Sequence, residues 1–241
     1  MEILNFFWVQ YLYIPLFNFL IWLYLNYSFY NLGVAVIILT VILRVVLLPF
    51  SILDERGKAI GHQVAAKVKE IEKDFSNDHL KKKTEIRKFL RSKKIRPWAK
   101  TVVLGVQILV LVLLYQVFIG GINTEAKLHL LYPSMPHPDF INTKFLIFNI
   151  AEKNLILPAI VAGYLFAEIL IAQWRQKGEL SRREQIYSVL FPAISFVLLA
   201  ILPSVKSVFI LTSLIFSSII SAIVAAMNIN LKKAKKSAET K

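Results

Sequence analysis

One charged residue lies in the middle of a long apolar segment, where a charge is energetically unfavourable. The run covers residues 33–53, and Arg44 is its only charge. Arg44 comes eleven residues after Gly33, so in a helix it would lie ~16 Å along a hydrocarbon core about 30 Å thick. An arginine at that depth costs roughly 2.5–3.5 kcal/mol on insertion scales. We therefore expect Arg44 to be paired, or to face water inside the protein, and to be central to function.

Further polar side chains interrupt the apolar runs at similar depths. Gln107 is expected ~14 Å from the opposite end of its run, nearly level with Arg44, and Glu168 about one turn deeper. Thr40 lies one turn from Arg44, on the same helix face. The remaining candidates are Gln173, Ser217 and Ser221. Together these residues predict a polar cavity in the inner half of a membrane.

Most of these candidates also have a simpler explanation. Ser217 and Ser221 could bond only to their own helix backbone, as buried hydroxyls commonly do. Gln107 could join two helices, and Glu168 could be a counter-ion of Arg44 or reach the inner interface. Arg44 has no comparable explanation, because arginines near the middle of a membrane are rare unless they are functional.

Several classes of chemistry are unsupported by the sequence. There is no cysteine, which excludes a disulfide, a thiolate nucleophile and a cysteine zinc site. The pair Gly57-Lys58 lacks the upstream glycine of a nucleotide-binding loop. The four histidines, at 62, 79, 129 and 137, show no ligand spacing. We therefore expect no catalytic residue, metal, cofactor or small-molecule substrate, and we expect the protein not to be an enzyme.

The composition predicts an all-α polytopic membrane protein. The chain of 241 residues is 56% hydrophobic, with a mean hydropathy of +0.59. Residues 1–32 contain twelve aromatic residues and no lysine or arginine, which favours a helix lying on the outer membrane interface over a full span. The expected bundle has five spans, at residues 33–53, 98–120, 154–174, 185–203 and 205–228.

The charges predict the orientation of these spans. Lysine and arginine predominate in residues 54–97, in the loop 175–184 and in the tail 229–241, whereas the loop 121–153 has no net charge. By the positive-inside rule, the N-terminus is expected outside a bacterial plasma membrane and the C-terminus in the cytoplasm. Within 54–97, apolar residues at helical spacing predict an antiparallel, coiled-coil-like helical hairpin in the cytoplasm.

The basic tail offers a candidate for a further partner. Its lysines, Lys232, Lys233, Lys235 and Lys236, could contact lipid headgroups and fix the topology. The alternative is binding to ribosomal RNA, which would be strongly salt-dependent.

The order of these features resembles the YidC/Oxa1/Alb3 insertases. The similarity is carried by YIPLFNFL at 13–20, GVAVIILTVILRVVLLPFSI at 33–52 and VQILVLVLLYQVF at 106–118. The large external domain of longer family members has no counterpart here, so the chain resembles the short, five-span form. Where the family has Pro-Ser-Gly before the last span, this chain has Pro203-Ser204-Val205-Lys206.

This resemblance implies an insertase for nascent membrane proteins. In the family, the matching arginine lies in a water-filled groove that is open to the cytoplasm and to lipid and closed to the outside. A client's hydrophobic segment passes sideways into the bilayer without nucleotide hydrolysis, alone or with the general secretion channel. Two other classes remain open at this point, namely a secondary transporter or channel using Arg44 and Glu168, and a scaffold for membrane assembly.

Overall fold

The computed structural model of the chain describes residues 2–55, 98–119, 121–122, 125–138, 140–175 and 182–239, with some positions between 68 and 86. It divides into two compact units, each considered by itself. The first contains Met1–Arg44 and Ile108–Ile215, and the second contains Val45–Gln107 and Phe216–Lys241. Most of the expected helical hairpin 54–97 and of the loop 175–184 lies outside the described residues.

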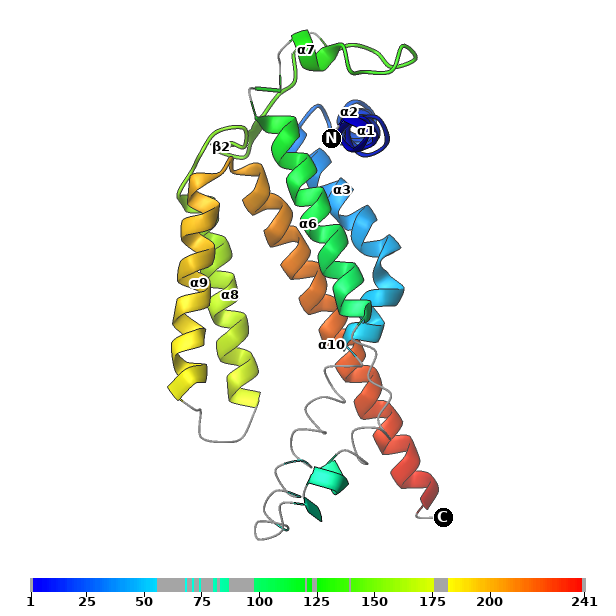
Figure 1. The fold of residues 1–241 in the computed structure, drawn as a ribbon, viewed down its shortest axis with the longest axis vertical. Coiled ribbons are helices and arrows are strands. Elements are labelled where there is room, and N and C mark those ends of the chain that lie inside the picture. The colour runs from blue at the N-terminus through cyan, green and yellow to red at the C-terminus, as the bar shows by residue number, and fades with distance from the viewer. Residues whose placement is uncertain are drawn as a thin grey trace. The chain divides into compact units, whose positions relative to one another are not determined.

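The expected all-α class is confirmed. Among the described residues, four helices are long and apolar enough to cross a membrane, or five if a bent pair counts as one span, and the strands form one small two-stranded sheet (Figure 1). The elements are α1 (Glu2–Phe7), the π-helix η1 (Trp8–Tyr13), α2 (Ile14–Asn26), α3 (Leu32–Val46), α6 (Trp98–Phe118), α7 (Glu125–Leu128), β1 (Lys144–Phe145), β2 (Phe148–Asn149), α8 (Ile156–Arg175), α9 (Arg182–Ile201) and α10 (Val205–Glu239).

The first expected span is bent rather than straight. The run 33–53 forms α3 and a second helix, Leu48–Glu55, with an angle of 65° between them. Pro49 explains the break, because its ring cannot donate a backbone hydrogen bond and would clash with the carbonyl one turn earlier. The first backbone hydrogen bond of the second helix runs from the Ser51 N–H to the carbonyl of Leu47, just before that helix, at 2.9 Å. Arg44 therefore lies in the last turn before the bend.

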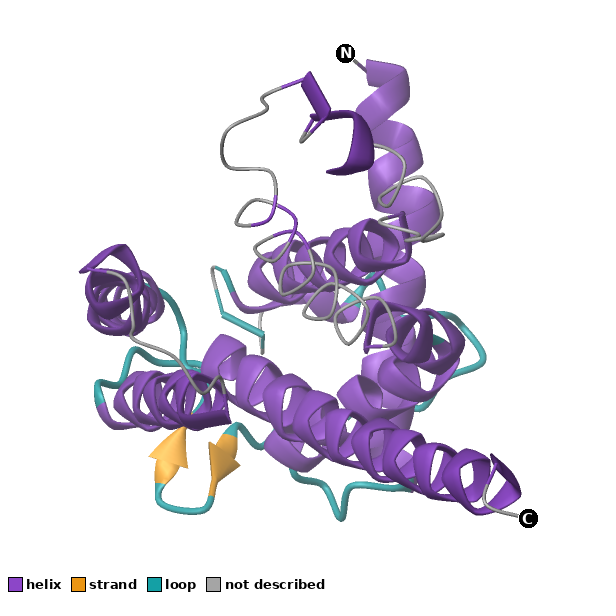
Figure 2. Ribbon diagram, turned by 90° about the horizontal axis from the view of Figure 1, so that it is seen from below, coloured by secondary structure: helices purple, strands orange, loops and turns teal. Residues whose placement is uncertain are grey.

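The aromatic N-terminal stretch lies across the end of its unit. In Figure 1, α1 and α2 are viewed along their axis, whereas α3 and α6 run vertically, and Figure 2 shows the same crossing from below. Asn5–Asn26 is long and apolar enough to cross a membrane. Within the unit this stretch crosses α3, and its expected place on the membrane interface stays a prediction.

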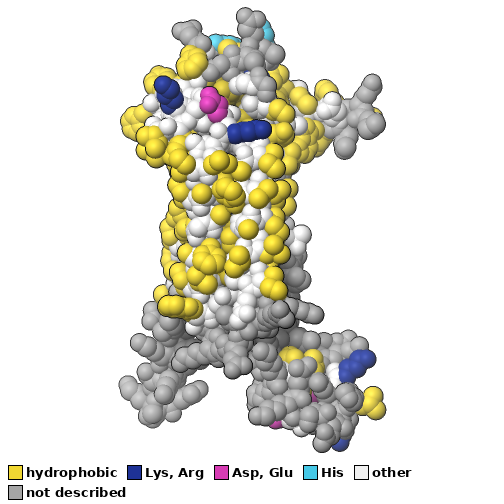
Figure 3. Space-filling model, turned by 90° about the vertical axis from the view of Figure 1, so that its left-hand side faces the viewer, with side chains coloured by type: hydrophobic (Ala, Val, Ile, Leu, Met, Phe, Trp, Pro, Cys, Tyr) yellow, Lys and Arg dark blue, Asp and Glu magenta, His cyan; other side chains and the backbone are white. Residues whose placement is uncertain are grey.

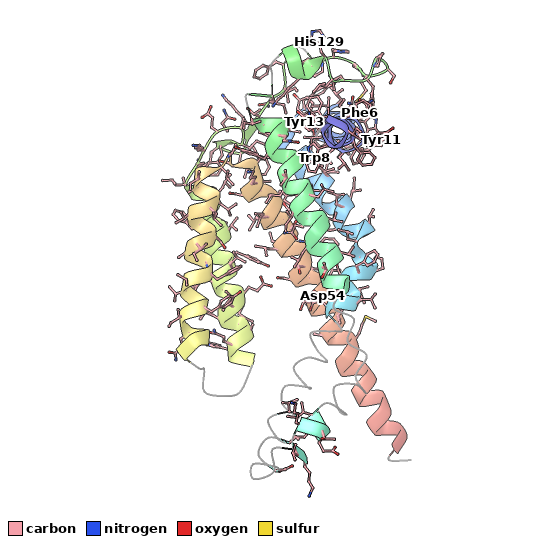
Figure 4. The ribbon with its side chains drawn as sticks, viewed as in Figure 1. Phe6, Trp8, Tyr11, Tyr13, Asp54 and His129 are labelled. Atoms are coloured by element: carbon pink, nitrogen blue, oxygen red, sulfur yellow. The ribbon has the colours of Figure 1, made fainter. Side chains whose placement is uncertain are left out.

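The two sides of this N-terminal stretch differ. Tyr13 and Trp8 lie on the side toward α6, whereas Phe6 and Tyr11 point away from it (Figure 4). The Trp8 indole N–H donates a 2.8 Å hydrogen bond to Gln116 Oε1 on α6. Phe6 and Tyr11 are more than half exposed. One side thus packs on the bundle and the other presents aromatic rings, as suits a membrane interface.

Helices α8 and α9 form an antiparallel pair within the first unit (Figure 1). The buried residues of α9, Ser188, Pro192 and Leu199, recur at helical spacing and form one narrow stripe. Pro192 sits inside a helix that stays continuous. Most other α9 side chains are exposed and apolar, and Figure 3 shows this side as a broad hydrophobic surface with charged side chains near its upper end. Such a surface is suited to lipid.

Candidate functional site

The candidate site is built on one face of α3. Its buried residues occupy one half of the helix surface, and they are Leu32, Gly33, Ala35, Val36, Leu39, Thr40 and Arg44. On the opposite side, Val41 and Val45 are exposed. The sequence therefore directs the arginine into the protein and the valines outward, where lipid would lie.

Arg44 is only 8% exposed, which makes it one of the few buried charges among the described residues. It interacts with at least one other group. A guanidinium stays charged even when it is buried and paired, because its pKa lies far above neutral pH. Arg44 can therefore present a permanent positive charge inside the apolar layer.

Thr40 is fully buried one turn before Arg44. Its hydroxyl donates a 2.6 Å hydrogen bond to the Val36 carbonyl of the same helix. Because this bond uses the only proton of the hydroxyl, Thr40 can offer a neighbour only its remaining acceptor capacity. The structure thus places Thr40 and Arg44 one turn apart on the same buried face of α3.

Glu168 and Gln173 lie on α8, in the same unit as Arg44. Glu168 is half-buried and continues the less exposed stripe of Leu157 and Val161, whereas Phe166 and Trp174 face outward. Gln173 is also half-buried, and both polar side chains have interaction partners. Their placement away from the exposed stripe suits groups that avoid lipid.

The other three candidates belong to the second unit. Gln107 on α6 and Ser217 and Ser221 on α10 are each half-buried. Gln107 has an interaction partner. The grouping of these three residues with Arg44 stays a prediction.

A second buried cation was missed from the sequence. Lys206, in the first turn of α10, is 4% exposed, and its Nζ lies 3.7 Å from the centre of the Tyr115 ring of α6. A desolvated cation over an aromatic face is stabilised by roughly 2 kcal/mol. The neighbouring Ser207 hydroxyl is buried and has no hydrogen-bond partner among the described residues. The sequence feature that could have revealed this buried cation is its position, because Lys206 directly follows the residues that match the family's Pro-Ser-Gly.

A further lysine, Lys127, binds the C-terminal end of α6. Lys127 Nζ donates to the carbonyls of Gln116 at 3.1 Å, of Val117, and of Ile119 at 2.5 Å. The last carbonyls of a helix have no partner within it, and a cation there also complements the helix dipole. Burial lowers the pKa of Lys127 to about 8. The sequence did not reveal this role, because Lys127 counts there only toward the zero net charge of the loop 121–153.

No group of three or more His, Asp or Glu side chains that could hold a metal ion occurs in the part of the chain that the structure describes. Arg44 and Lys206 are the buried charged side chains among the described residues.

Comparison with known proteins gives relatives of one kind. The family model described as "60Kd inner membrane protein" matches residues 22–233. A membrane protein insertase YidC of Bordetella petrii is 26% identical over 198 residues, which cover 74% of this chain and 35% of that protein. Another, of Clostridium tetani, is 32% identical over 100 residues, which cover 41% of this chain and 44% of that protein. The chain thus spans about a third of the length of the Bordetella relative.

Proposed function

This chain belongs to the YidC/Oxa1 family of membrane protein insertases, and on that premise we propose that it inserts hydrophobic segments of nascent proteins into the lipid bilayer. The observation that supports this most directly is Arg44, a buried charge on the inward face of an otherwise apolar helix. The resemblance noted in the sequence is confirmed by the family match, which covers most of the chain.

The proposed path is a polar groove that opens to the cytoplasm. Arg44 attracts the acidic residues of a client's translocated tail, and attraction is strong where the surroundings are poorly solvated. The polar side chains that complete the groove are Thr40, Gln107, Glu168, Gln173, Ser217 and Ser221. A polar groove that reaches partway through the membrane shortens the apolar distance that the tail must cross.

The energy for this step comes from the client itself. A hydrophobic segment of about 20 residues partitions favourably from water into the bilayer core. Its transfer offsets the cost of moving a short polar tail, so the proposed reaction needs no nucleotide. The chain is proposed to work in a bacterial inner membrane with its N-terminus outside, alone or beside the secretion channel, and the tail lysines are candidate ribosome contacts.

The test is insertion into liposomes that contain only the purified protein. A short single-span client should become integrated and protease-protected without any nucleotide, and protein-free liposomes serve as the control. Flux of small solutes without client integration would instead indicate a transporter. If the liposomes show no insertion and no solute flux, the protein is an assembly scaffold, and the proposed function is refuted.

A further inference from the structure

The short sheet ends in a turn of unusual composition. Strands β1 and β2 pair antiparallel, with Phe145 opposite Phe148, so Leu146 and Ile147 form a two-residue turn. Turns of this length favour Asn, Asp and Gly, because they need positive φ angles. Leu146 has a φ of 55° all the same. Leu146 is 79% exposed and Ile147 is 87% exposed. We call these two residues the apolar tip.

The β-hairpin that carries this tip is fastened to the start of α3. The side chain of Asn31 donates from Nδ2 to the Lys144 carbonyl at 2.9 Å. The same Asn31 caps α3, because its Oδ1 accepts the Gly33 N–H at 3.0 Å. Gly33 also lies directly against Phe145, and a Cβ at this position would overlap the ring. The contact therefore requires glycine, and it joins the hairpin closely to α3.

The hairpin is also fastened to the start of α10. Immediately after β2, Ile150 donates its N–H to the Thr143 carbonyl at 3.0 Å and accepts the Val205 N–H at 2.9 Å. Val205 is the first residue of α10. The tip is thus held by backbone and side-chain bonds to two spanning helices, although its own residues make an unfavourable turn.

The position of the tip indicates what covers it. α10 is long and apolar enough to cross a membrane, and so is α3 when it counts as one bent span with Leu48–Glu55. On this assignment, the residues where the two helices begin mark the level at which a bilayer core ends. Figure 2 shows the two strands at the edge of the unit, with their turn directed away from the helices. Lys144, at the base of the hairpin, is exposed. Its ammonium is suited to lipid phosphates while the aliphatic tip reaches the acyl region.

We propose that the apolar tip inserts into the membrane leaflet at this end of the bundle and holds the start of α3 at a fixed depth. From Leu32 to Arg44, α3 is one continuous helix, with a rise of ~18 Å. Fixing its first turn at the interface therefore fixes the depth of Arg44. The tip acts on the membrane position of the charge, independently of any client.

The absence of cysteine permits a direct test in liposomes of phosphatidylethanolamine and phosphatidylglycerol. Ile147→Cys carries an environment-sensitive nitrobenzoxadiazole label, and His137→Cys, on an exposed part of the same loop, carries the matched control label. The label at 147 should show blue-shifted emission and be quenched by lipids with a nitroxide near the headgroup, whereas the label at 137 should be quenched by aqueous iodide. Iodide quenching at 147 equal to that at 137 would overturn the proposal. So would protection at 147 from both quenchers, which would indicate that protein covers the tip.

A second variant tests the effect on depth. The double change Leu146→Asn with Ile147→Gly suits the turn geometry better but removes both aliphatic side chains. A label at Val41→Cys, on the exposed side of α3 one turn from Arg44, reports the membrane depth of this helix. In the double variant, depth-dependent quenching should place this label at a shallower depth, or over a broader range of depths, than in the protein with the native turn. An unchanged depth profile would refute the positioning role. Because no client is present, the outcome is separable from that of the insertion assay.

Discussion

Replacing Arg44 tests the proposed mechanism at its centre. The residue is almost fully buried on one face of α3, so its charge acts in surroundings that screen poorly. Arg44→Lys keeps the charge on a different stem, and Arg44→Ala removes it. If the charge attracts acidic tails, the lysine variant should retain much of the insertion activity and the alanine variant should lose it.

The size of the loss follows from Coulomb's law. Opposite unit charges ~6 Å apart, at an effective dielectric constant of ~20, attract each other by ~3 kcal/mol. Since about 1.4 kcal/mol corresponds to a factor of ten in rate, Arg44→Ala should slow the insertion of an acidic-tailed client by up to ~100-fold. A client with a neutral tail lacks this attraction, and its insertion should change little.

The assay compares insertion rates of the two clients in liposomes at equal protein content. Val41→Ala is the matched control, because Val41 lies one turn from Arg44 on the exposed side of the same helix. This control should insert both clients as the native protein does. Full activity of Arg44→Ala on the acidic-tailed client would refute the proposed role of the charge.

Thermal unfolding separates this role from a structural one. Removing an expensive buried charge need not destabilise a bundle. If Arg44 instead serves mainly as a counter-ion of Glu168, Arg44→Ala would leave the half-buried Glu168 carboxylate without this counter-ion and lower the free energy of unfolding. Adding Glu168→Gln would then restore stability, and the double-mutant cycle measures the coupling.

Two further predictions concern the loop lysine and the orientation. Because burial lowers the pKa of Lys127 to about 8 from 10.5, the unfolded chain binds more protons between these values, and stability should rise with pH across that range. Because Lys127 is partly exposed, the free energy of unfolding should rise by only about 1 kcal/mol across this range, measured by thermal unfolding. The same rise in Lys127→Met would exclude Lys127 as the titrating group. Single cysteines at positions 79 and 238 should react with an impermeant maleimide only from the cytoplasm, and one at 137 only from outside. Labelling of position 79 from outside would reverse the proposed orientation, and with it the opening of the groove.

The helices and the inward face of α3 could be predicted from the sequence for simple physical reasons. A bilayer demands long apolar helices, so run length predicts where such helices form, while the bounds of the membrane spans stay a prediction. Helical spacing then places Thr40 on the same face as Arg44, and burial on that face agrees. The α3 break was not predicted, although Pro49 was visible. Pro192 lies in an equally apolar run and leaves α9 continuous, because the effect of a proline depends on whether neighbouring groups satisfy the freed carbonyl.

The bonds that organise the loop 121–153 could not be predicted, because they join residues far apart in the chain. Asn18 donates 2.9 Å bonds to the Ile14 and Leu130 carbonyls and accepts the Tyr132 N–H at 2.7 Å. Tyr24 accepts the Asn142 N–H at 2.9 Å. In the sequence, Asn18 only interrupts an aromatic stretch, since nothing local identifies a carbonyl more than 100 residues away. Such bonds depend on the folded backbone, which the residue pattern alone does not supply.

These bonds give the N-terminal stretch a structural part in the proposed mechanism. Through Asn18 and Tyr24 it holds the loop, and through Asn31 and Gly33 the loop is joined to the first turn of α3. From there α3 runs without interruption to Arg44, and the bend comes only after it, at Leu47. Arg44 is therefore joined to the N-terminal stretch and the loop through a helix segment that lies entirely before the bend. A client that displaces the segment after Leu47 would leave Arg44 at its depth, as a fixed attractive charge requires.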